Sequence, residues 1–228
     1  MILLIGASGG IGKELLPHLA KRDQVIATYH SSPLRALPKG VRQIKLDLSS
    51  SKEVLKFAHH LRQRANKIIF INLAALSVDD LFLNLSLSSW KKVFDVNLHS
   101  SALMLQTLLP KMIENRWGRI ILASSVVAEQ GVVGAGAYCS SKLALEGLCK
   151  TLAHEYGRFN ITSNLLKMGY FEKGLIETLA PASLQEVLDR IPSKKFGSVK
   201  NIFHAIDFML KADYLNGASI TLDGGLVR

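Results

Sequence analysis

A tyrosine and a lysine, Tyr138 and Lys142, stand four residues apart in the stretch YCSSK. Residues with this spacing lie one turn apart on the same face of a helix. Apolar residues repeat at helical spacing downstream, so we expect this face to point into the core. An ammonium beside a phenol lowers the pKa of the phenol, so the pair could exchange protons near neutrality. A buried tyrosine beside a lysine that reaches out to solvent is the alternative.

A glycine-rich loop, GASGGIG, follows the first apolar run and precedes a helical pattern. Glycines at Gly6, Gly10 and Gly12 would let the backbone turn tightly and approach a pyrophosphate at the positive end of a helix. A strand-to-helix turn without a ligand is the alternative. However, a place after the first strand of an alternating chain is the context that the motif requires. The loop therefore predicts dinucleotide binding.

The end of the second predicted strand, TYHSSPLR, bears on which dinucleotide is bound. An acidic side chain there would hydrogen-bond the ribose 2′-hydroxyl and favour NAD. This chain has His30, Ser31 and Arg35 instead, which could accept a 2′-phosphate, so NADP (NADPH) is favoured over NAD. After the third strand, Asp47 could meet the adenine edge or cap a nearby helix.

The elements that must position these residues can be read from seven short runs. Most are continuously apolar, as expected for strands covered on both faces. The seven runs are residues 2–5, 24–29, 42–46, 67–72, 119–124, 161–166 and 218–222. Helical patterns alternate with them, among them 51–63 and 89–115. The alternation predicts an α/β fold, a Rossmann-type doubly wound parallel sheet of about seven strands with helices on both faces. We expect residues 1–228 to form one domain.

The 228 residues carry a formal net charge of +10, from 28 Lys and Arg against 18 Asp and Glu. This charge is scattered and lacks the stripe typical of nucleic-acid-binding proteins. An acidic substrate, cofactor or protein partner, or simply a solvated basic surface, would explain it. Cys139 and Cys149 give no metal-ligand spacing, and no apolar run approaches the ~20 residues of a membrane span. We expect a cytoplasmic protein with no metal, nucleic acid or membrane partner.

The catalytic candidates resemble those of the short-chain dehydrogenase/reductase family, and the resemblance covers essentially the whole chain. The family's YxxxK pair matches Tyr138 and Lys142. Its catalytic serine matches Ser125, with the adjacent Ser124 as the less favoured candidate, and its helix asparagine matches Asn97. Four matches at the right separations make the resemblance specific.

The resemblance implies hydride transfer between a nicotinamide and a carbonyl/alcohol pair. Tyr138 would protonate the forming alkoxide, and Ser125 would hydrogen-bond the same oxygen. Lys142 would lower the tyrosine pKa and hold the nicotinamide ribose, and Asn97 would hold a water linking Lys142 to solvent. Beside Tyr138 and Lys142, the implied cofactor contacts are Gly6, Ser8, Gly10, Ile11, Gly12, His30, Ser31, Asp47, Leu48, Asn72, Ala74, Gly169 and Phe171.

The chain departs from the family pattern in the stretch KMGYFEK. Met168 replaces a proline before Gly169, and Lys173 stands where a threonine would help to hold the nicotinamide carboxamide. Cofactor placement, or the anionic end of a substrate, could therefore differ. A catalytically silent cofactor-binding protein with a regulatory or scaffolding role is the alternative, against which the four catalytic matches argue.

Within the family, residues 190–210 are most similar to 3-oxoacyl-(acyl-carrier-protein) reductases, and we expect the substrate-binding segment at about 169–196. The implied substrate is a carrier-protein-bound 3-oxoacyl group; a small ketone, pteridine or sugar-derived carbonyl remains open. Arg116 and Arg158 would flank the entrance and meet an acidic carrier protein, unless they are ordinary loop arginines. The resemblance also implies a homodimer or homotetramer, with the 89–115 and 138–157 helices pairing between subunits.

Overall fold

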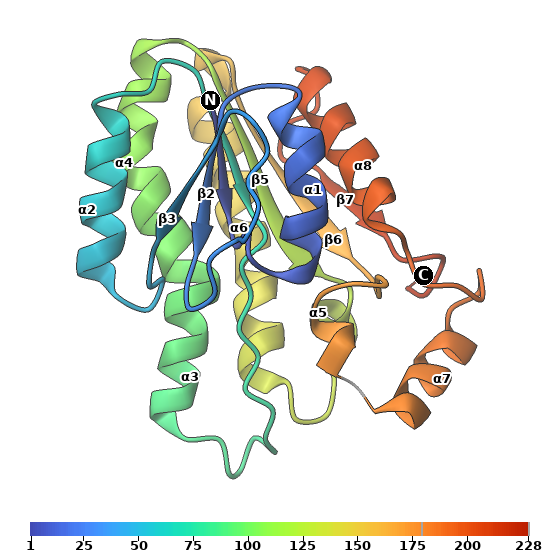
Figure 1. Ribbon diagram of the computed structural model, residues 1–228. Helices are drawn as coiled ribbons and strands as arrows, with labels where there is room; N and C mark the ends of the chain where they lie inside the picture. The colour runs from blue at the N-terminus through green and yellow to red at the C-terminus, as the bar shows by residue number, and fades with distance from the viewer. Residues whose placement is uncertain (179, 228) are drawn as a thin grey trace.

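Seven parallel strands form one sheet in the computed structural model, which describes residues 1–178 and 180–227 (Figure 1). Their order across the sheet is β3-β2-β1-β4-β5-β6-β7. The strands are β1 Ile2–Ile5, β2 Val25–Tyr29, β3 Val41–Lys45, β4 Ile68–Asn72, β5 Gly118–Ser125, β6 Ile161–Met168 and β7 Ser219–Leu222. Each begins and ends within two residues of a predicted run. The predicted doubly wound α/β fold is confirmed.

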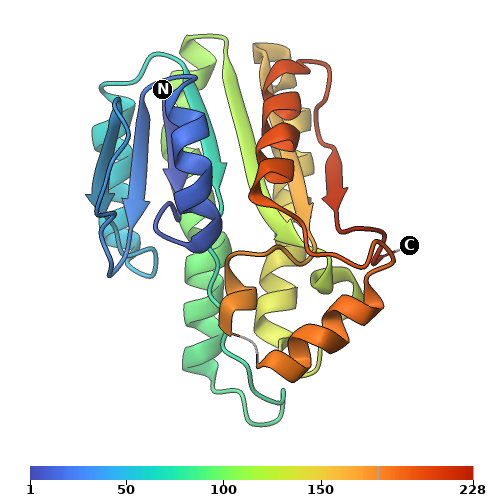
Figure 2. The same cartoon turned by 45° about the vertical axis from the view of Figure 1, so that its right-hand side comes forward.

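Helices cover both faces of the sheet, as Figure 2 shows. They are α1 Gly10–Ala20, α2 Ser51–Arg62, α3 Leu87–Phe94, α4 Ser100–Glu114, α5 Val127–Gln130, α6 Gly136–Tyr156, α7 Pro181–Arg190 and α8 Val199–Lys211. A π-helical turn, Asp95–His99, joins α3 to α4, so the predicted 89–115 helix is one continuous helical segment. Within the described ranges, no helix combines the length and the apolar character needed to cross a membrane.

Alternate residues of each central strand divide between two cores. In β1, Leu3 and Ile5 pack with α2, α4 and α6, whereas Ile2 and Leu4 pack with α1 and α8. All four side chains are fully buried, and burial of each stabilises the fold by about 1.5–3 kcal/mol. This two-sided burial explains why the strand runs are continuously apolar.

The direction of winding reverses between β1 and β4, which pair from Ile2 with Ile69 to Ile5 with Asn72. The chain leaves β1 into α1 on one face of the sheet, and it leaves β4 toward α4 on the other face. The two loops therefore diverge at the carboxyl ends of the strands (Figure 1). In open α/β sheets, ligands bind in the crevice at such a reversal.

Candidate active site

A cleft of about 850 Å³ lies at the carboxyl edge of the sheet, within the ~300–1,000 Å³ typical of small-molecule sites. Most of the predicted site residues line it. They are Gly6, Ser8, Gly10, Ile11, Gly12, His30, Asp47, Leu48, Ala74, Ser125, Tyr138, Lys142, Gly169 and Phe171. Three predicted residues, Ser31, Asn72 and Asn97, lie outside the lining of this cleft.

The glycine loop makes a tight turn at the start of α1. Gly6 has a φ of 81°, and its amide donates to Thr28 Oγ1 at 3.2 Å. A Cβ at Gly12 would lie 2.5 Å from the Gly6 carbonyl oxygen, so only glycine allows α1 to pack this closely on β1. The N-cap residue of α1, Gly9, supplies no side-chain cap. The N–H groups at the start of α1 are therefore suited to an anion such as a pyrophosphate.

Tyr138 and Ser125 line the same cleft. Tyr138 lies in the first turn of α6, and Ser125 is the last residue of β5. Burial raises the pKa of the Tyr138 phenol, while a hydrogen bond with the Ser125 hydroxyl acts in the opposite direction. The Ser125 Oγ also donates to the Met168 carbonyl at 3.4 Å. The adjacent Ser124 donates instead to the Lys142 carbonyl at 2.9 Å, which leaves Ser125 as the serine beside the phenol.

The Lys142 side chain points inward, as its helical position predicts. Its ammonium donates to the carbonyls of Ala74 at 3.1 Å and Ala123 at 2.9 Å. Burial lowers the pKa of Lys142 to about 8. The expected lowering of the Tyr138 pKa is not found, because desolvation of the phenol prevails and the ammonium faces two backbone carbonyls.

Asn97 lies in the π-helical turn and is fully buried behind the cleft. Its Oδ1 accepts from the Leu76 amide at 2.7 Å, and its Nδ2 donates to the Leu76 carbonyl at 2.9 Å and to Ser141 Oγ at 2.9 Å. The side chain thus ties the loop after β4 to α6. The water-holding role implied by the family resemblance stays a prediction.

Asn72 has a similar position at the end of β4. Its Oδ1 accepts from the Ala74 amide at 2.8 Å, and its Nδ2 donates to Ser101 Oγ at 2.5 Å. Because the Ala74 carbonyl receives the Lys142 ammonium, Asn72 shapes the cleft through the loop backbone.

At the other end of the cleft, His30 Nε2 lies 3.9 Å from Asp47 Oδ1. The same oxygen accepts hydrogen bonds from the Ser49 hydroxyl at 2.7 Å and the Ser49 amide at 2.9 Å, which hold the pKa of Asp47 below its ordinary value. The N-cap of α2 is Ser50, whose side chain accepts from the Glu53 amide. The cap role considered for Asp47 is therefore excluded, and its adenine contact stays a prediction.

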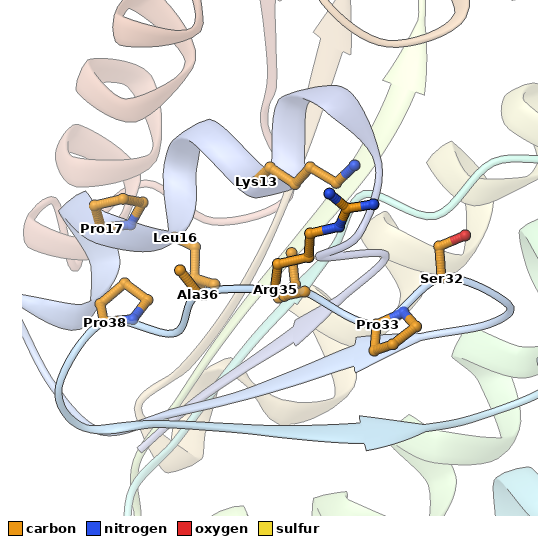
Figure 3. Close-up of a pocket in the computed structure, with 9 residues that line it drawn as sticks. Lys13, Leu16, Pro17, Ser32, Pro33, Arg35, Ala36 and Pro38 are labelled. Atoms are coloured by element: carbon orange, nitrogen blue, oxygen red, sulfur yellow. The ribbon is translucent and has the colours of Figure 1, made fainter.

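A second hollow, of about 530 Å³, lies between α1 and the loop that follows β2. Figure 3 shows Lys13 from α1 and Arg35 from this loop with their charged ends on the side where Ser32 lies. Neither cation forms an ion pair within residues 1–178 and 180–227. Lys13 was not predicted from the sequence, although its place directly after Gly12 could have marked it.

Lys173, which replaces the expected threonine, lines the cleft. Its Nζ lies 3.8 Å from both Glu14 Oε1 and Glu177 Oε1. A Cβ at Gly10 would lie 2.5 Å from Glu177 Oε2, so the segment after β6 closes over the glycine loop. The Lys173 charge is thus directed toward acidic side chains beside this loop.

Tyr170, Asp79 and Lys92 also line the cleft, and sequence reasoning missed all three. Tyr170 adjoins Gly169, so its place in the KMGYFEK stretch could have marked it. Asp79 and Lys92 lie outside every motif, and only the folded chain brings them to the cleft.

Arg116 and Arg158 do not flank the cleft, so that prediction is wrong for this chain. Arg116 precedes β5 and Arg158 precedes β6, at the amino ends of the strands, whereas Ser125 lies at the carboxyl end of β5. A strand of 8 residues places the two ends of β5 about 25 Å apart. The Arg116 guanidinium donates to the Arg158 carbonyl at 3.4 Å at this far edge.

Comparisons with known proteins identify relatives of this chain. The profile of a family described as short chain dehydrogenase matches residues 1–183. The 3-oxoacyl-(acyl-carrier-protein) reductases FabG of Buchnera aphidicola subsp. Baizongia pistaciae and Aquifex aeolicus are each 31% identical to this chain. Both alignments cover 98% of this chain and 96% of the relative. The FabG of Pseudomonas aeruginosa is 29% identical over the same shares.

The fold has a close counterpart among solved structures. A crystal structure of a protein described provisionally as a betaketoacyl-ACP reductase superposes with a TM-score of 0.85. The match covers 99% of this chain and 97% of that chain at 22% identity. At this identity the similarity supports the fold alone.

Proposed function

The chain belongs to the short-chain dehydrogenase/reductase family of nicotinamide-dependent oxidoreductases, and we propose that it reduces a carrier-protein-bound 3-oxoacyl group with NADPH. One observation carries the proposal. The Tyr138 and Ser125 hydroxyls and the buried Lys142 ammonium line the same cleft as the glycine loop. The substrate class rests on the names of the relatives.

The chemistry follows from what these side chains can donate. A bound nicotinamide would supply a hydride to the carbonyl carbon. Tyr138 donates its phenolic proton to the carbonyl oxygen, and Ser125 donates a hydrogen bond to the same oxygen. Lys142 supplies the positive charge that stabilises the phenolate left on Tyr138. A positioned general acid of this kind contributes about 10²–10⁴-fold to the rate.

Cofactor preference follows from the charges around the end of β2. Lys13, Arg35 and Ser32 line the hollow beside this strand. We expect NADPH to bind more tightly than NADH in a fluorescence titration. Arg35→Ala should weaken NADPH binding by about tenfold, as expected for one charge-assisted hydrogen bond, and leave NADH binding unchanged. Arg42→Ala, which removes an exposed arginine of β3, is the matched control. Tighter NADH binding by the wild type would overturn the preference.

A cofactor-binding protein without turnover is the second candidate, and Lys173 favours it. Its ammonium replaces a threonine hydroxyl beside the cofactor end of the cleft and is directed toward Glu14 and Glu177. Such a charge could hold the segment after β6 over the glycine loop and prevent substrate from entering.

The test is a substrate panel followed by NADPH consumption. It contains a 3-oxobutyryl group on an acyl-carrier protein, the same group on a short thiol, a small ketone, a pteridine and a sugar-derived ketone. We expect turnover with both thioesters and higher kcat/KM for the carrier-bound one. NADPH binding without consumption of any substrate would favour the cofactor-binding protein without turnover. Faster reduction of the pteridine or a ketone than of the thioesters would show that the substrate is not a 3-oxoacyl group.

A further inference from the structure

Lys167 is a nearly buried cation held between carboxylates of two helices. Its side chain is 10% exposed. Its ammonium contacts Glu129 on α5 and lies 3.0 Å from Glu146 Oε2 on α6. Burial opposes the charge, but hydrogen bonds with Glu129 and Glu146 prevail and raise the pKa of Lys167. Hydrogen bonds with Lys150 and then with Lys167 lower the pKa of Glu146.

The place of Lys167 in β6 puts it beside the backbone that holds the catalytic serine. It directly precedes Met168, whose carbonyl accepts from Ser125 Oγ at 3.4 Å and from the Val126 amide at 3.0 Å. In the register of β5 and β6, Lys167 is the partner of Ser124. A shift of this part of β6 would therefore move the Ser125 hydroxyl.

Its two partners belong to the other segments of the site. Glu129 lies in α5, four residues after Ser125. Glu146 lies in α6, one turn beyond Lys142. The ammonium thus links the turn after β5, the helix that carries Tyr138 and the end of β6.

We propose that Lys167 is a positioning residue for carbonyl reduction, whose ammonium sets the spacing between the Ser125 turn and the α6 helix that carries Tyr138. Without this cation, the Glu129 and Glu146 carboxylates would repel each other as like charges in a partly buried place. Removal of one partner from such a cluster leaves charge uncompensated, so the two helices would separate. The inference rests on the proposed reduction for its kinetic readout.

The test compares three single variants of the full chain. Lys167→Met removes the charge and keeps a long side chain, Lys167→Arg keeps the charge, and Lys150→Met removes the other cation on Glu146 without touching Glu129. We expect Lys167→Met to lower kcat by about ten- to a hundredfold, as small misplacements of reacting groups do, with the Kd for NADPH changed less than about twofold. Lys167→Arg should restore most of kcat, and Lys150→Met should leave it near the wild-type value.

A second readout keeps the inference separate from the choice of substrate. Ultraviolet titration of tyrosinate, taken as the difference from Tyr138→Phe, reports the Tyr138 pKa without substrate. Because the Ser125 hydrogen bond lowers this pKa, its loosening in Lys167→Met should raise it. If the wild type reduces no substrate, this titration alone decides the role of Lys167.

If Lys167→Met does not fold, Glu129→Gln is tested in its place. The Glu129 side chain is 36% exposed, and glutamine is nearly the same size as glutamate, so we expect this variant to fold. We expect Glu129→Gln to lower kcat and raise the Tyr138 pKa in the same direction. A lower melting temperature with unchanged kcat and unchanged Tyr138 titration would show a merely structural ion pair and overturn the inference.

Discussion

At the scale of single residues, burial decides the chemistry of the site. Lys142 is 3% exposed, and its ammonium donates to two neutral carbonyls, so within the described residues its desolvation is not offset by a carboxylate. Its pKa consequently falls to about 8, which leaves the protonated and neutral forms both accessible at mildly alkaline pH. Tyr138, buried beside it, has its pKa raised. The unliganded pair is therefore largely tyrosine and lysinium at neutrality, the state in which Tyr138 can donate a proton.

The lowered pKa of Lys142 predicts a pH dependence of stability. Between about pH 8 and pH 10, the unfolded chain, with an ordinary lysine pKa near 10.4, binds more protons at this residue than the folded chain. The free energy of unfolding should therefore rise with pH in this window, by at most about 1.4 kcal/mol per unit. Urea unfolding of wild type and Lys142→Met at pH 7, 8, 9 and 10 measures it. Subtracting the free energy of unfolding of Lys142→Met from that of the wild type cancels the contributions of other titrating groups. A difference that does not change with pH would contradict the lowered pKa of Lys142.

The presence of Tyr138, Ser125 and Lys142 in one cleft could be predicted from residue types and spacing together with the family resemblance. Their protonation could not, because burial lowers the pKa of Lys142, and only the folded chain buries its ammonium against the carbonyls of Ala74 and Ala123. The wrong expectation for Arg116 was avoidable, because the predicted strand 119–124 already lies between Arg116 and Ser125 and so puts them at opposite edges of the sheet.

At the scale of elements, the glycines of the loop after β1 have separable tasks. A Cβ at Gly12 would lie 2.5 Å from the Gly6 carbonyl oxygen and 2.7 Å from Ala7 Cα, both in backbone that cannot move aside cheaply. A Cβ at Gly9 would have the Gly6 oxygen at 3.5 Å as its nearest neighbour, and Gly9 has an ordinary extended backbone. Gly12 is therefore needed for packing, and Gly9 is not.

We expect Gly12→Ala to lower the free energy of unfolding by about 1–3 kcal/mol, as overpacking does. Gly9→Ala, its matched control, should change it by less than about 0.5 kcal/mol. Urea denaturation followed by circular dichroism measures both. Equal effects of the two substitutions would contradict the packing of α1 on β1.

The strands were predictable because their apolar runs are short, β-branched or leucine-rich, and buried on both faces. The π-helical turn Asp95–His99 was not, because its register is held by contacts remote in sequence. Asn97 hydrogen-bonds Leu76 and Ser141, and only the folded chain brings these together.

At the scale of the whole molecule, three large apolar side chains of α3 and the loop before it are exposed. Phe82, Leu83 and Leu87 are 76%, 93% and 66% exposed, and the Phe82 ring lies 6.1 Å from Trp90 in an edge-on arrangement. On α6, Leu143 is 48% exposed. Large exposed apolar patches commonly mark protein interfaces, which agrees with the predicted pairing through the 89–115 and 138–157 helices.

We expect sedimentation equilibrium to give a multiple of the 25.0 kDa chain mass, for a homodimer or homotetramer. Leu143→Lys should shift the equilibrium toward the monomer, because it places a charge in the predicted interface. Phe208→Lys, on α8 and similarly exposed, should leave the mass unchanged. A wild-type mass of 25.0 kDa at all concentrations would refute the oligomer.

The central claim is that Tyr138 donates the proton in NADPH-dependent carbonyl reduction. The most direct measurement is single-turnover oxidation of bound NADPH by a 3-oxobutyryl thioester, compared between wild type and Tyr138→Phe. Because the substitution removes only the hydroxyl, we predict NADPH binding within about twofold of wild type and a rate lower by about 10²–10⁴-fold. A Tyr138→Phe rate within a few-fold of the wild-type rate would contradict the account.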